Sequence, residues 1–379
     1  RRGVGRGTDA YGAFGDARGG SAARRGASSA RGGFADAYGA VGSGAKGAPG
    51  GRIMIDQFGR RVEYLRISVT DKCNLRCVYC MPLEGLDWLK RESLLSYEEI
   101  ASVVRAMAGM GLKKVRISGG EPLIRKDLSH LVRLVAEIPG IEDISLSTNA
   151  VLLADQAQDL HDAGISRVNV SLDSLQEERV EAIARRPGCF DGIMRGLEAA
   201  EAVGFDPIKI NVVLIGGQND DEIEDFARIT QDRPWHVRFI ELMPTGSNLA
   251  LSANNFVSCQ DALARIRRMG SIEPVDGPAG NGPATYFRFP GAAGTVGVIT
   301  PMSHNYCDTC NRMRLTADGQ LRPCLFGSIQ TNLRDPLRAG TDLVPLIEET
   351  LHIKPERHYL IQGSDEGSGG LVALSQTGG

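Results

Sequence analysis

The chain has 379 residues, 42% of them hydrophobic and 23% charged, which are ordinary values for a globular protein. Its net charge of −3, from 43 basic and 46 acidic residues, excludes a polycationic nucleic-acid coat, although a local basic cluster can still lie in a cleft. No apolar run approaches the ~18 residues that a membrane span needs, so we expect neither nucleic acid nor membrane as a partner. The eight cysteines are too sparse for a disulfide scaffold, so their spacing carries the information.

Residues 1–50 are dominated by small side chains and hold 15 glycines and 12 alanines. This segment lacks hydrophobic periodicity and cannot bury enough apolar surface to offset its ordering entropy, so we expect it to be disordered. It has no apolar stretch of the kind that a secretory signal carries, and Asp9, Asp16 and Asp36 argue against an organelle transit peptide. We therefore look for function in residues 51–379.

From Arg61 onward, short β-branched runs alternate with amphipathic helical stretches. The predicted strands are 62–69, 113–118, 142–147, 167–172, 208–215 and 236–242, and the predicted helices are 97–110, 127–138, 155–163, 190–203 and 221–231. A capping box of Ser96 and Glu99 marks the start of the first helix. Strict alternation predicts an α/β fold with a parallel sheet, which an open doubly wound sheet and a barrel both satisfy. Functional residues at the carboxyl ends of the strands favour a partial (β/α)6 barrel of the TIM type over residues 51–244.

After Pro244 this alternation ends. We expect a helix over 252–270, a loop over 271–284, short strands over 285–289 and 294–300, and then a cysteine-bearing segment over 304–326. We interpret residues 245–379 as a C-terminal region that folds over the mouth of the barrel. The small residues at the end of the chain are typical of a frayed tail.

Three cysteines follow the first predicted strand in a C-x3-C-x2-C pattern: Cys73, Cys77 and Cys80. Thiolates select zinc or iron–sulfur clusters. A structural zinc ion normally takes four ligands, and no fourth Cys or His lies nearby in the sequence. A disulfide would leave one cysteine over. The pattern therefore predicts a [4Fe–4S] cluster with three iron atoms held by cysteine and the fourth open.

This pattern, with Tyr79 before its last cysteine and the sequence GGEP at 119–122, resembles the signature of radical S-adenosylmethionine (SAM) enzymes. The resemblance implies a partial or full (β/α) barrel whose open iron binds SAM, which is then cleaved to methionine and a 5′-deoxyadenosyl radical. It further implies SAM contacts at Tyr79, Gly120, Ser171 and Met243. Without the resemblance, GGEP would be an ordinary turn and Met243 a core residue.

A second group, Cys307, Cys310 and Cys324, forms a C-x2-C-x13-C pattern. His304 lies three residues before Cys307, so a Cys3His zinc site is chemically reasonable. The segment from 307 to 326 closely resembles, however, the C-terminal motif of the GTP 3′,8-cyclases of molybdenum cofactor biosynthesis. In that family the three cysteines hold a second [4Fe–4S] cluster, whose free iron contacts the guanine base.

The resemblance extends from about residue 58 to the last residue. Its further matches are FGR at 58–60, YLRISVT at 64–70, RFIELMP at 238–244 and the terminal Gly378-Gly379. Cys189 and Cys259 match neither motif, and we interpret them as incidental.

GTP carries about four negative charges, so its site needs fixed cations, preferably arginines that bind phosphate in a bidentate manner. Taken alone, each basic residue is more often solvated or paired at the surface. The family sequence TTNG is STNA here at 147–150, which keeps a hydroxyl at the first position and leaves the effect of Ala150 on the turn open. The resemblance implies GTP contacts at Arg66, Arg116, Ser147, Lys209, Arg312, Met313 and Arg314.

The resemblance also gives the tail a role, in which Gly378 and Gly379 thread into the active site and assist the reaction together with Arg312 and Arg314. The implied activity is that of a lyase: the radical removes the 3′ hydrogen of GTP, and C3′ attacks guanine C8 to form 3′,8-cyclo-7,8-dihydroguanosine 5′-triphosphate. The implied partners are a flavodoxin- or ferredoxin-like electron donor and cyclic pyranopterin monophosphate synthase, and a homodimer is compatible with the family. Open clusters are sensitive to oxygen, so we expect the reducing cytoplasm.

Two alternatives remain open from the sequence. A radical SAM enzyme of peptide maturation with an auxiliary cluster predicts more C-terminal cysteines and gives Arg312 and Arg314 no role. A non-catalytic iron–sulfur or zinc-ribbon binding module predicts sites closed by four ligands, whereas each group here offers three cysteines.

Overall fold

The computed structural model describes residues 53–82, 84–244, 248–280, 282–358 and 374–377. Residues 50–379 form one compact unit. The expected disorder of residues 1–50 and the two terminal glycines lie outside the described residues. Every described helix is too short or too polar to cross a bilayer.

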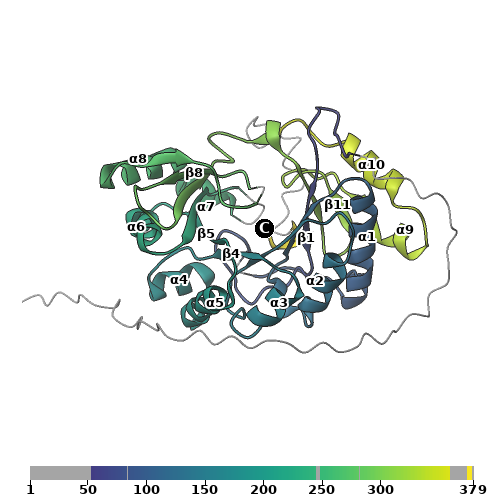
Figure 1. Cartoon of the computed structure of the whole chain (residues 1–379), viewed down its shortest axis with the longest axis horizontal. Coiled ribbons are helices and arrows are strands. Elements are labelled where there is room, and N and C mark those ends of the chain that lie inside the picture. Colours follow the sequence, from purple (N-terminus) through teal and green to yellow (C-terminus); the bar gives the residue numbers. More distant parts are fainter. Residues whose placement is uncertain (1–52, 83, 245–247, 281, 359–373, 378–379) are drawn as a thin grey trace, which may run out of the picture. The chain divides into compact units, whose positions relative to one another are not determined.

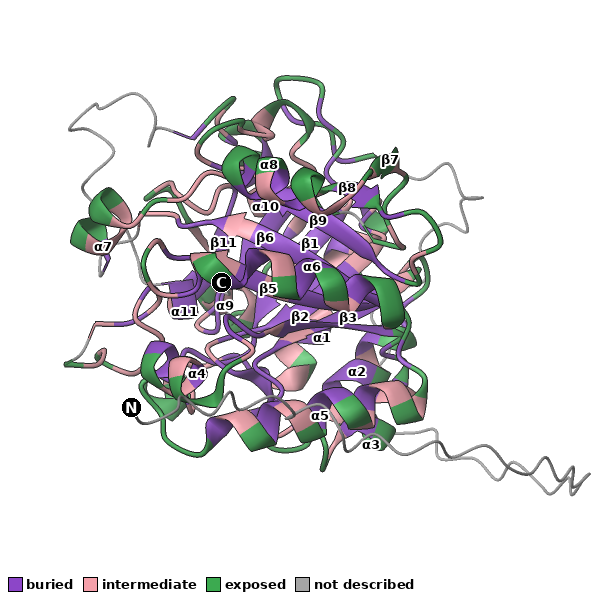
Figure 2. Cartoon of the chain, turned by 90° about the vertical axis from the view of Figure 1, so that its left-hand side faces the viewer, coloured by how far each residue is buried: buried purple, intermediate pink, exposed green. Residues whose placement is uncertain are grey.

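The predicted alternation of strands and helices is confirmed, with bounds within about two residues of those expected. Neighbouring strands pair in parallel in the order β1 to β6, as a TIM-type α/β fold requires. Helices α1 to α6 lie outside the strands (Figure 1), and the strands are buried while the outer helix faces are exposed (Figure 2). The strands are β1 (Tyr64–Ser68), β2 (Lys114–Ser118), β3 (Asp143–Thr148), β4 (Arg167–Ser171), β5 (Ile208–Leu214) and β6 (Trp235–Glu241). The helices are α1 (Tyr97–Gly109), α2 (Leu128–Ala136), α3 (Ala157–Ala163), α4 (Glu177–Ala184), α5 (Cys189–Val203) and α6 (Ile223–Asp232).

Helix α1 shows how the local sequence builds this layer. The Ser96 side chain accepts a hydrogen bond from the backbone N–H of Glu99, and the Glu99 carboxylate accepts one from the N–H of Ser96, which confirms the capping box. Ile100, Val103, Val104 and Met107 are buried on one face of the helix. Each such side chain stabilises the fold by roughly 1.5–3 kcal/mol relative to exposure.

The C-terminal region does more than cover the barrel, because two of its strands extend the parallel sheet. Strand β9 (Thr295–Ile299) pairs in parallel with β6, and β10 (Arg312–Leu315) pairs in parallel with β1. Antiparallel strands complete the edges: β7 (Glu273–Val275), β8 (Thr285–Arg288), β11 (Gln320–Arg322) and β12 (Thr331–Asn332). The strand order runs from β12 to β7 without closing, so the barrel is partial, as predicted.

Other expectations for this region need correction. The predicted helix over 252–270 is two helices, α7 (Leu249–Asn254) and α8 (Cys259–Met269), because the Ser258 side chain caps the second one through the N–H of Asp261. The expected loop over 271–284 contains the short β7. The remaining elements are α9 (Arg334–Arg338), α10 (Val344–His352), α11 (Leu374–Thr377) and the 3-10 turns η1 (Arg91–Ser93), η2 (Pro122–Ile124), η3 (Asp220–Glu222) and η4 (Cys307–Thr309).

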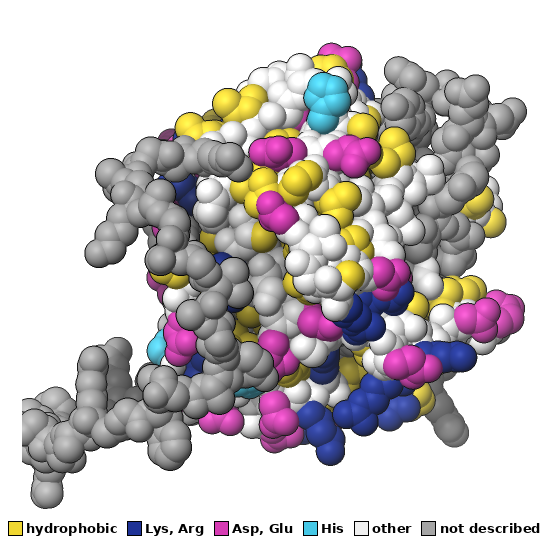
Figure 3. Space-filling model, turned by 90° about the vertical axis from the view of Figure 1, so that its right-hand side faces the viewer, with side chains coloured by type: hydrophobic (Ala, Val, Ile, Leu, Met, Phe, Trp, Pro, Cys, Tyr) yellow, Lys and Arg dark blue, Asp and Glu magenta, His cyan; other side chains and the backbone are white. Residues whose placement is uncertain are grey.

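The outer surface offers no strong charge of one sign on the face turned to the viewer in Figure 3, where basic and acidic side chains lie beside one another. The unusual concentration of charge lies inside the molecule, among the strands.

Candidate active site

Alternate residues of the parallel strands point into the barrel, and many of them are polar. Strand register places Arg66 opposite Arg116 on one side and Arg314 on the other. Together with the loops at the carboxyl ends of the strands, these residues line one deep cavity. Because alternate positions of a strand share one face, the arginines of β1, β2 and β10 enter this cavity while their apolar neighbours enter the core.

Five arginines line the cavity, against two carboxylates, Glu121 and Asp173, among the described lining residues. Burial holds the pKa of Arg66 well below its usual value, with repulsion from neighbouring arginines added. Burial likewise lowers the pKa of Arg116 and of Arg314 to about 10. Like charges packed this closely are costly unless an anion joins them, so this end of the cavity fits a polyanionic ligand. The five are Arg66, Arg116, Arg238, Arg312 and Arg314.

Arg238 was not among the predicted site residues. Its side chain is 2% exposed, and its Nη2 donates to the side-chain oxygens of Asn169 (2.8 Å) and Asn211 (2.5 Å). Its Nε is buried without a partner. The available signal was its place in the RFIELMP motif of β6, in register with Asn211 of β5.

The first three cysteines lie on the loop that follows β1, past the end of the strand that carries Arg66. Cys73, Cys77 and Cys80 all line the cavity, and burial together with the charges of Cys80 and Cys73 raises the pKa of Cys77. Burial raises the pKa of the Cys73 thiol to about 11 and that of Cys80 to about 12. Thiols held neutral in this way become ligands when a metal centre replaces their protons.

The two glycines of GGEP serve backbone packing. A Cβ on Gly120 would lie 2.1 Å from the carbonyl oxygen of Lys72, and one on Gly119 would lie 2.7 Å from that of Thr70. The N–H of Gly120 donates to Thr70 O (2.6 Å). Only glycine permits this approach, which fixes the segment just before Cys73. Both glycines also line the cavity, so the same absence of a side chain leaves their backbone open on that side.

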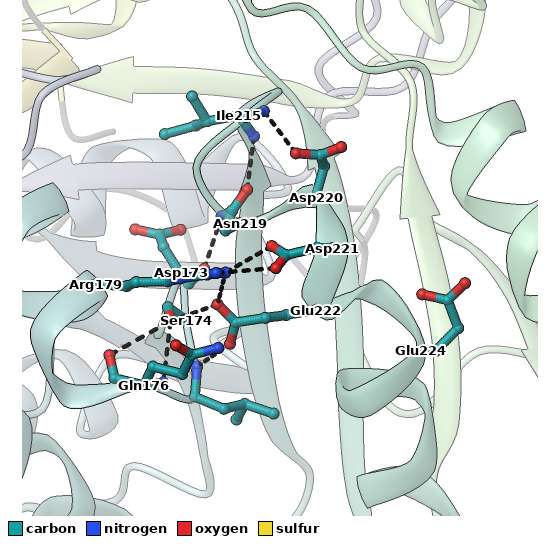
Figure 4. A network of polar contacts seen from close by, with 12 residues as sticks. Asp173, Ser174, Gln176, Arg179, Ile215, Asn219, Asp220, Asp221, Glu222 and Glu224 are labelled. Carbon is teal, nitrogen blue, oxygen red and sulfur yellow. Dashed lines mark hydrogen bonds and ion pairs between the residues drawn. The ribbon is translucent and has the colours of Figure 1, made fainter. Parts of the chain in front are cut away.

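A hydrogen-bonded network holds the remaining wall at the ends of β4 and β5. The Tyr79 hydroxyl donates to Asp173 Oδ2 (2.8 Å), and Asp173 Oδ1 accepts from the N–H of Val213 (2.8 Å). Burial raises the pKa of Asp173 to about 6. Behind it, Asn219 donates to the carbonyl of Asp173, and Arg179 joins Glu222 (Figure 4). Ser171, Met243 and Gly120 also line this part of the cavity.

The second three cysteines lie just outside the cavity. Cys307, Cys310 and Cys324 do not line it, but their neighbours Tyr306, Arg312 and Leu325 do. Burial raises the pKa of Cys307. Burial would also raise that of Cys310, but the charges of Lys354 and Arg312 outweigh it, so its pKa lies below the usual value.

The predicted alternative of a Cys3His zinc site is not formed. His304 is exposed, and its Nε2 lies 3.4 Å from the side-chain nitrogen of Gln260. Within the described ranges, no three His, Cys, Asp or Glu side chains converge closely enough to hold a single metal ion.

Comparison with known proteins decides the family. Residues 67–229 match the radical SAM superfamily, and residues 235–360 match the Molybdenum Cofactor Synthesis C family. The GTP 3′,8-cyclase of Pelotomaculum thermopropionicum is 49% identical over 314 residues, which are 82% of this chain and 96% of that protein. The GTP 3′,8-cyclase of Moorella thermoacetica is 46% identical, and the match covers 86% of this chain and 100% of that protein. That of Listeria monocytogenes is 49% identical, and the match covers 82% of this chain and 93% of that protein. The chain belongs to the GTP 3′,8-cyclase family.

Two of the GTP contacts expected from this family lie elsewhere than the cavity surface. Lys209 is one layer deeper, where its Nζ donates to the carbonyl oxygen of Ala279 (2.5 Å). Burial, with repulsion from Arg238 and Arg167, lowers the pKa of Lys209 to about 6. Met313 lies on the other face of β10, fully buried in the hydrophobic core, so only its backbone can face a ligand.

The departures from the usual GTP 3′,8-cyclase sequence TTNG can now be placed. Ser147 lines the cavity, and its buried hydroxyl has no hydrogen-bond partner among the described residues, as expected of a ligand-binding group before its ligand arrives. Ala150 has a φ of +61°, in the left-handed region that favours glycine. The turn is therefore kept, with backbone strain of about 1 kcal/mol.

The C-terminal segment enters the cavity of this GTP 3′,8-cyclase family member. Leu374 and Ser375 of α11 line it, and Arg314 Nη1 donates to the carbonyl oxygen of Thr377 (3.2 Å). The backbone N–H of Ser375 bonds the Cys80 thiol. In Figure 1 this yellow segment lies near the middle of the strands. The prediction of a frayed tail is wrong for residues 374–377, while Gly378 and Gly379 lie beyond the described residues.

Proposed function

We propose that this chain is a radical SAM GTP 3′,8-cyclase, a lyase that converts GTP to 3′,8-cyclo-7,8-dihydroguanosine 5′-triphosphate in molybdenum cofactor biosynthesis. The observation that carries the proposal is the lining of one cavity, which combines three cysteines from the loop after β1 with five arginines from the strands. This arrangement suits a small polyanion held beside a metal centre. The alternative enzyme class would bind a peptide, which brings no polyanion to neutralise the buried arginines.

The first site suits a [4Fe–4S] cluster with SAM. Cys73, Cys77 and Cys80 would hold the cluster, since all three line the cavity. Their raised pKa values keep the thiols protonated until iron displaces the protons. When bound, the cluster and SAM supply a 5′-deoxyadenosyl radical. Tyr79, Gly120, Ser171 and Met243 would bind SAM, and the hydrogen bond to Asp173 fixes the ring of Tyr79 for that purpose.

The second site would hold a second [4Fe–4S] cluster on Cys307, Cys310 and Cys324. Three observations support this assignment: burial and the charges of Cys324 and Cys310 raise the pKa of Cys307, basic side chains act on Cys310, and His304 contacts Gln260 instead. Their neighbour Arg312 lines the cavity, which brings this cluster to the end that would bind the guanine base.

The arginine end would bind the triphosphate and the base. Arg116 and Arg238 are held rigid by burial and Arg66 is half-buried beside them, so they can bind phosphate oxygens with little loss of side-chain entropy. Ser147 would donate its free hydroxyl and Lys209 its ammonium. Arg312 and Arg314 would orient the base together with Gly378 and Gly379, because Arg314 already contacts Thr377, one residue before them.

The rest of the proposal follows from the chemistry of the product and the cofactors. A flavodoxin- or ferredoxin-like protein would reduce the first cluster, and cyclic pyranopterin monophosphate synthase would take the product. The protein would work in the cytoplasm, where open clusters survive, and a homodimer is compatible with it.

The test is an anaerobic incubation of cluster-loaded protein with GTP, SAM and a strong reductant, followed by mass spectrometry. We expect 5′-deoxyadenosine and the cyclised nucleotide together, the loss of both in Cys77→Ala, and the loss of the nucleotide in Cys310→Ala. Cys259→Ala is the matched control, because that thiol is buried between β6 and β9 and does not line the cavity. 5′-Deoxyadenosine without a GTP-derived product would move the substrate elsewhere. Neither product, from protein with both clusters, would refute the proposal.

A further inference from the structure

A buried lysine beside the second set of cysteines has no role in the function proposed above. Lys354 follows α10, and its side chain is 2% exposed. Its Nζ donates to the carbonyl oxygens of Pro323 (2.6 Å) and Arg312 (2.9 Å) and lies 3.6 Å from the Cys310 sulfur. An ammonium has three donors, and these contacts use all of them. Because Pro323 precedes Cys324, one side chain joins the two arms of the cysteine motif.

The charge of this ammonium has no carboxylate partner. In the part of the chain that the structure describes, all three of its contacts are to carbonyl oxygens or sulfur. Burying an unpaired ammonium costs several kcal/mol, so such a residue needs an anion within reach. The ionisable group in contact with it is the thiol of Cys310.

A second cation on the same site is neutralised, which makes Lys354 distinctive. Arg60, the last residue of the FGR motif, forms an ion pair with Asp56 (2.6 Å). Its Nη1 donates to the carbonyl oxygens of Cys307 (2.9 Å) and Glu356 (2.8 Å). Arg60 therefore clamps the backbone around the second site. The charge of Arg312 also lowers the pKa of Cys310, but it is the Lys354 ammonium that lies within hydrogen-bond reach of the Cys310 sulfur.

We propose that Lys354 is a positioning residue of the second iron–sulfur site, whose ammonium holds the Cys310 thiolate and stabilises the reduced, more negative state of the cluster. This inference rests on the second cluster proposed above. A fixed positive charge close to a cluster, and a hydrogen bond to its sulfur ligand, both favour the form with one more electron.

The test uses the full chain with Cys73→Ser, Cys77→Ser and Cys80→Ser, so that only the second set of cysteines can hold iron. In this background Lys354→Met and Lys354→Gln remove the charge, the latter keeping a donor, and Lys354→Arg retains the charge. The readouts are iron content and the midpoint potential from a redox titration followed by electron paramagnetic resonance. Lys113→Met is the matched control, because Lys113 pairs with Glu142 near the surface.

We expect the equilibrium constant for reduction of the cluster to be at least tenfold smaller in the two uncharged variants. For a one-electron couple this moves the midpoint potential by about 59 mV or more to the negative side. Lys354→Arg and Lys113→Met should stay near the parent. Iron lost from both uncharged variants and kept in Lys354→Arg would support the same role. An unchanged potential in Lys354→Gln with full iron content would overturn it, as would equal loss of iron from all three variants. A parent protein that binds no iron would refute the second cluster itself.

Discussion

Two parts of the cavity lining differ in backbone and in charge: the loop that carries the first three cysteines, here the cysteine end, and the strands that carry the five arginines, here the arginine end. The cysteine end, with Cys73, Cys77 and Cys80, has the buried carboxyl groups of Glu121 and Asp173 as neighbours, and both raise the pKa of a nearby cysteine. The arginine end, with the second cysteines behind it, is surrounded by cations, and Cys310 has its pKa lowered instead.

This difference has a chemical meaning. Burial raises the pKa of Glu121 to about 7 and that of Asp173 to about 6, so each carries its negative charge above that pH. A negative charge nearby disfavours an additional electron, so there it would make a reduced cluster at the cysteine end a stronger electron donor. Nearby cations favour both bound anions and a reduced cluster at the arginine end. Two motifs of three cysteines therefore do not imply two equivalent sites, because the side chains around them set their properties.

The largest effect should come from Gly120→Ala, which damages the cysteine end alone. A Cβ there would lie 2.1 Å from the carbonyl oxygen of Lys72, a clash with backbone that only a shift of the cysteine-bearing segment can relieve. We expect a cost of more than ~3 kcal/mol and loss of the first cluster. Iron analysis and ultraviolet–visible spectra check this, with Gly109→Ala, which meets open space, as the control. Loss of iron from the second site instead would contradict the separation of the two ends.

Arg116→Met tests the arginine end. The variant keeps the aliphatic bulk and removes one cation, so GTP should bind about 10- to 100-fold more weakly through the loss of a charge-assisted hydrogen bond. Calorimetric titration with GTP measures this, and 5′-deoxyadenosine formation in the absence of GTP should be retained. Unchanged affinity would place the triphosphate elsewhere.

Lys209 predicts how GTP binding depends on pH. Its pKa is lowered to about 6 in the free protein, chiefly by burial and then by Arg238, Arg167 and Arg116, with Asp143 opposing them. A bound phosphate would raise that pKa, so binding takes up a proton and is strongest below pH 6. Above pH 6 the affinity should fall by up to tenfold per unit until the pKa of the complex is reached. Calorimetry in buffers of different ionisation enthalpy measures the proton uptake, which Lys209→Met should reduce.

The smallest effect concerns the turn between the two ends. Ala150 is held at positive φ, which glycine adopts without strain. We expect Ala150→Gly to stabilise the protein by about 0.5–1 kcal/mol, because the relief of strain exceeds the entropy that glycine adds to the unfolded chain. Urea unfolding checks the sign. Gly196→Ala should do the reverse and more strongly, since its Cβ would lie 2.2 Å from the carbonyl oxygen of Ala150.

Much of this protein could be predicted from local sequence. The six strand–helix units follow from periodicity, because a strand or amphipathic helix needs only its own apolar pattern to be recognised. Both cysteine motifs are equally local, since their ligands lie within eight and eighteen residues of sequence.

Only the tertiary structure decided which charges meet. Strand β10 pairs with β1 some 248 residues away, and that register sends Arg314 into the cavity and Met313 into the core. Arg60, Arg238 and Lys354 take their roles from partners that are distant in the chain. The motifs around Arg60 and Arg238 indicated the family, but not these contacts. The sequence by itself determined the helices and strands and the chemistry of the ligands. The long-range pairing of strands determined which charged side chains lie near those ligands, and therefore the electrostatic potential at the site, because electrostatic energy depends on distance in space.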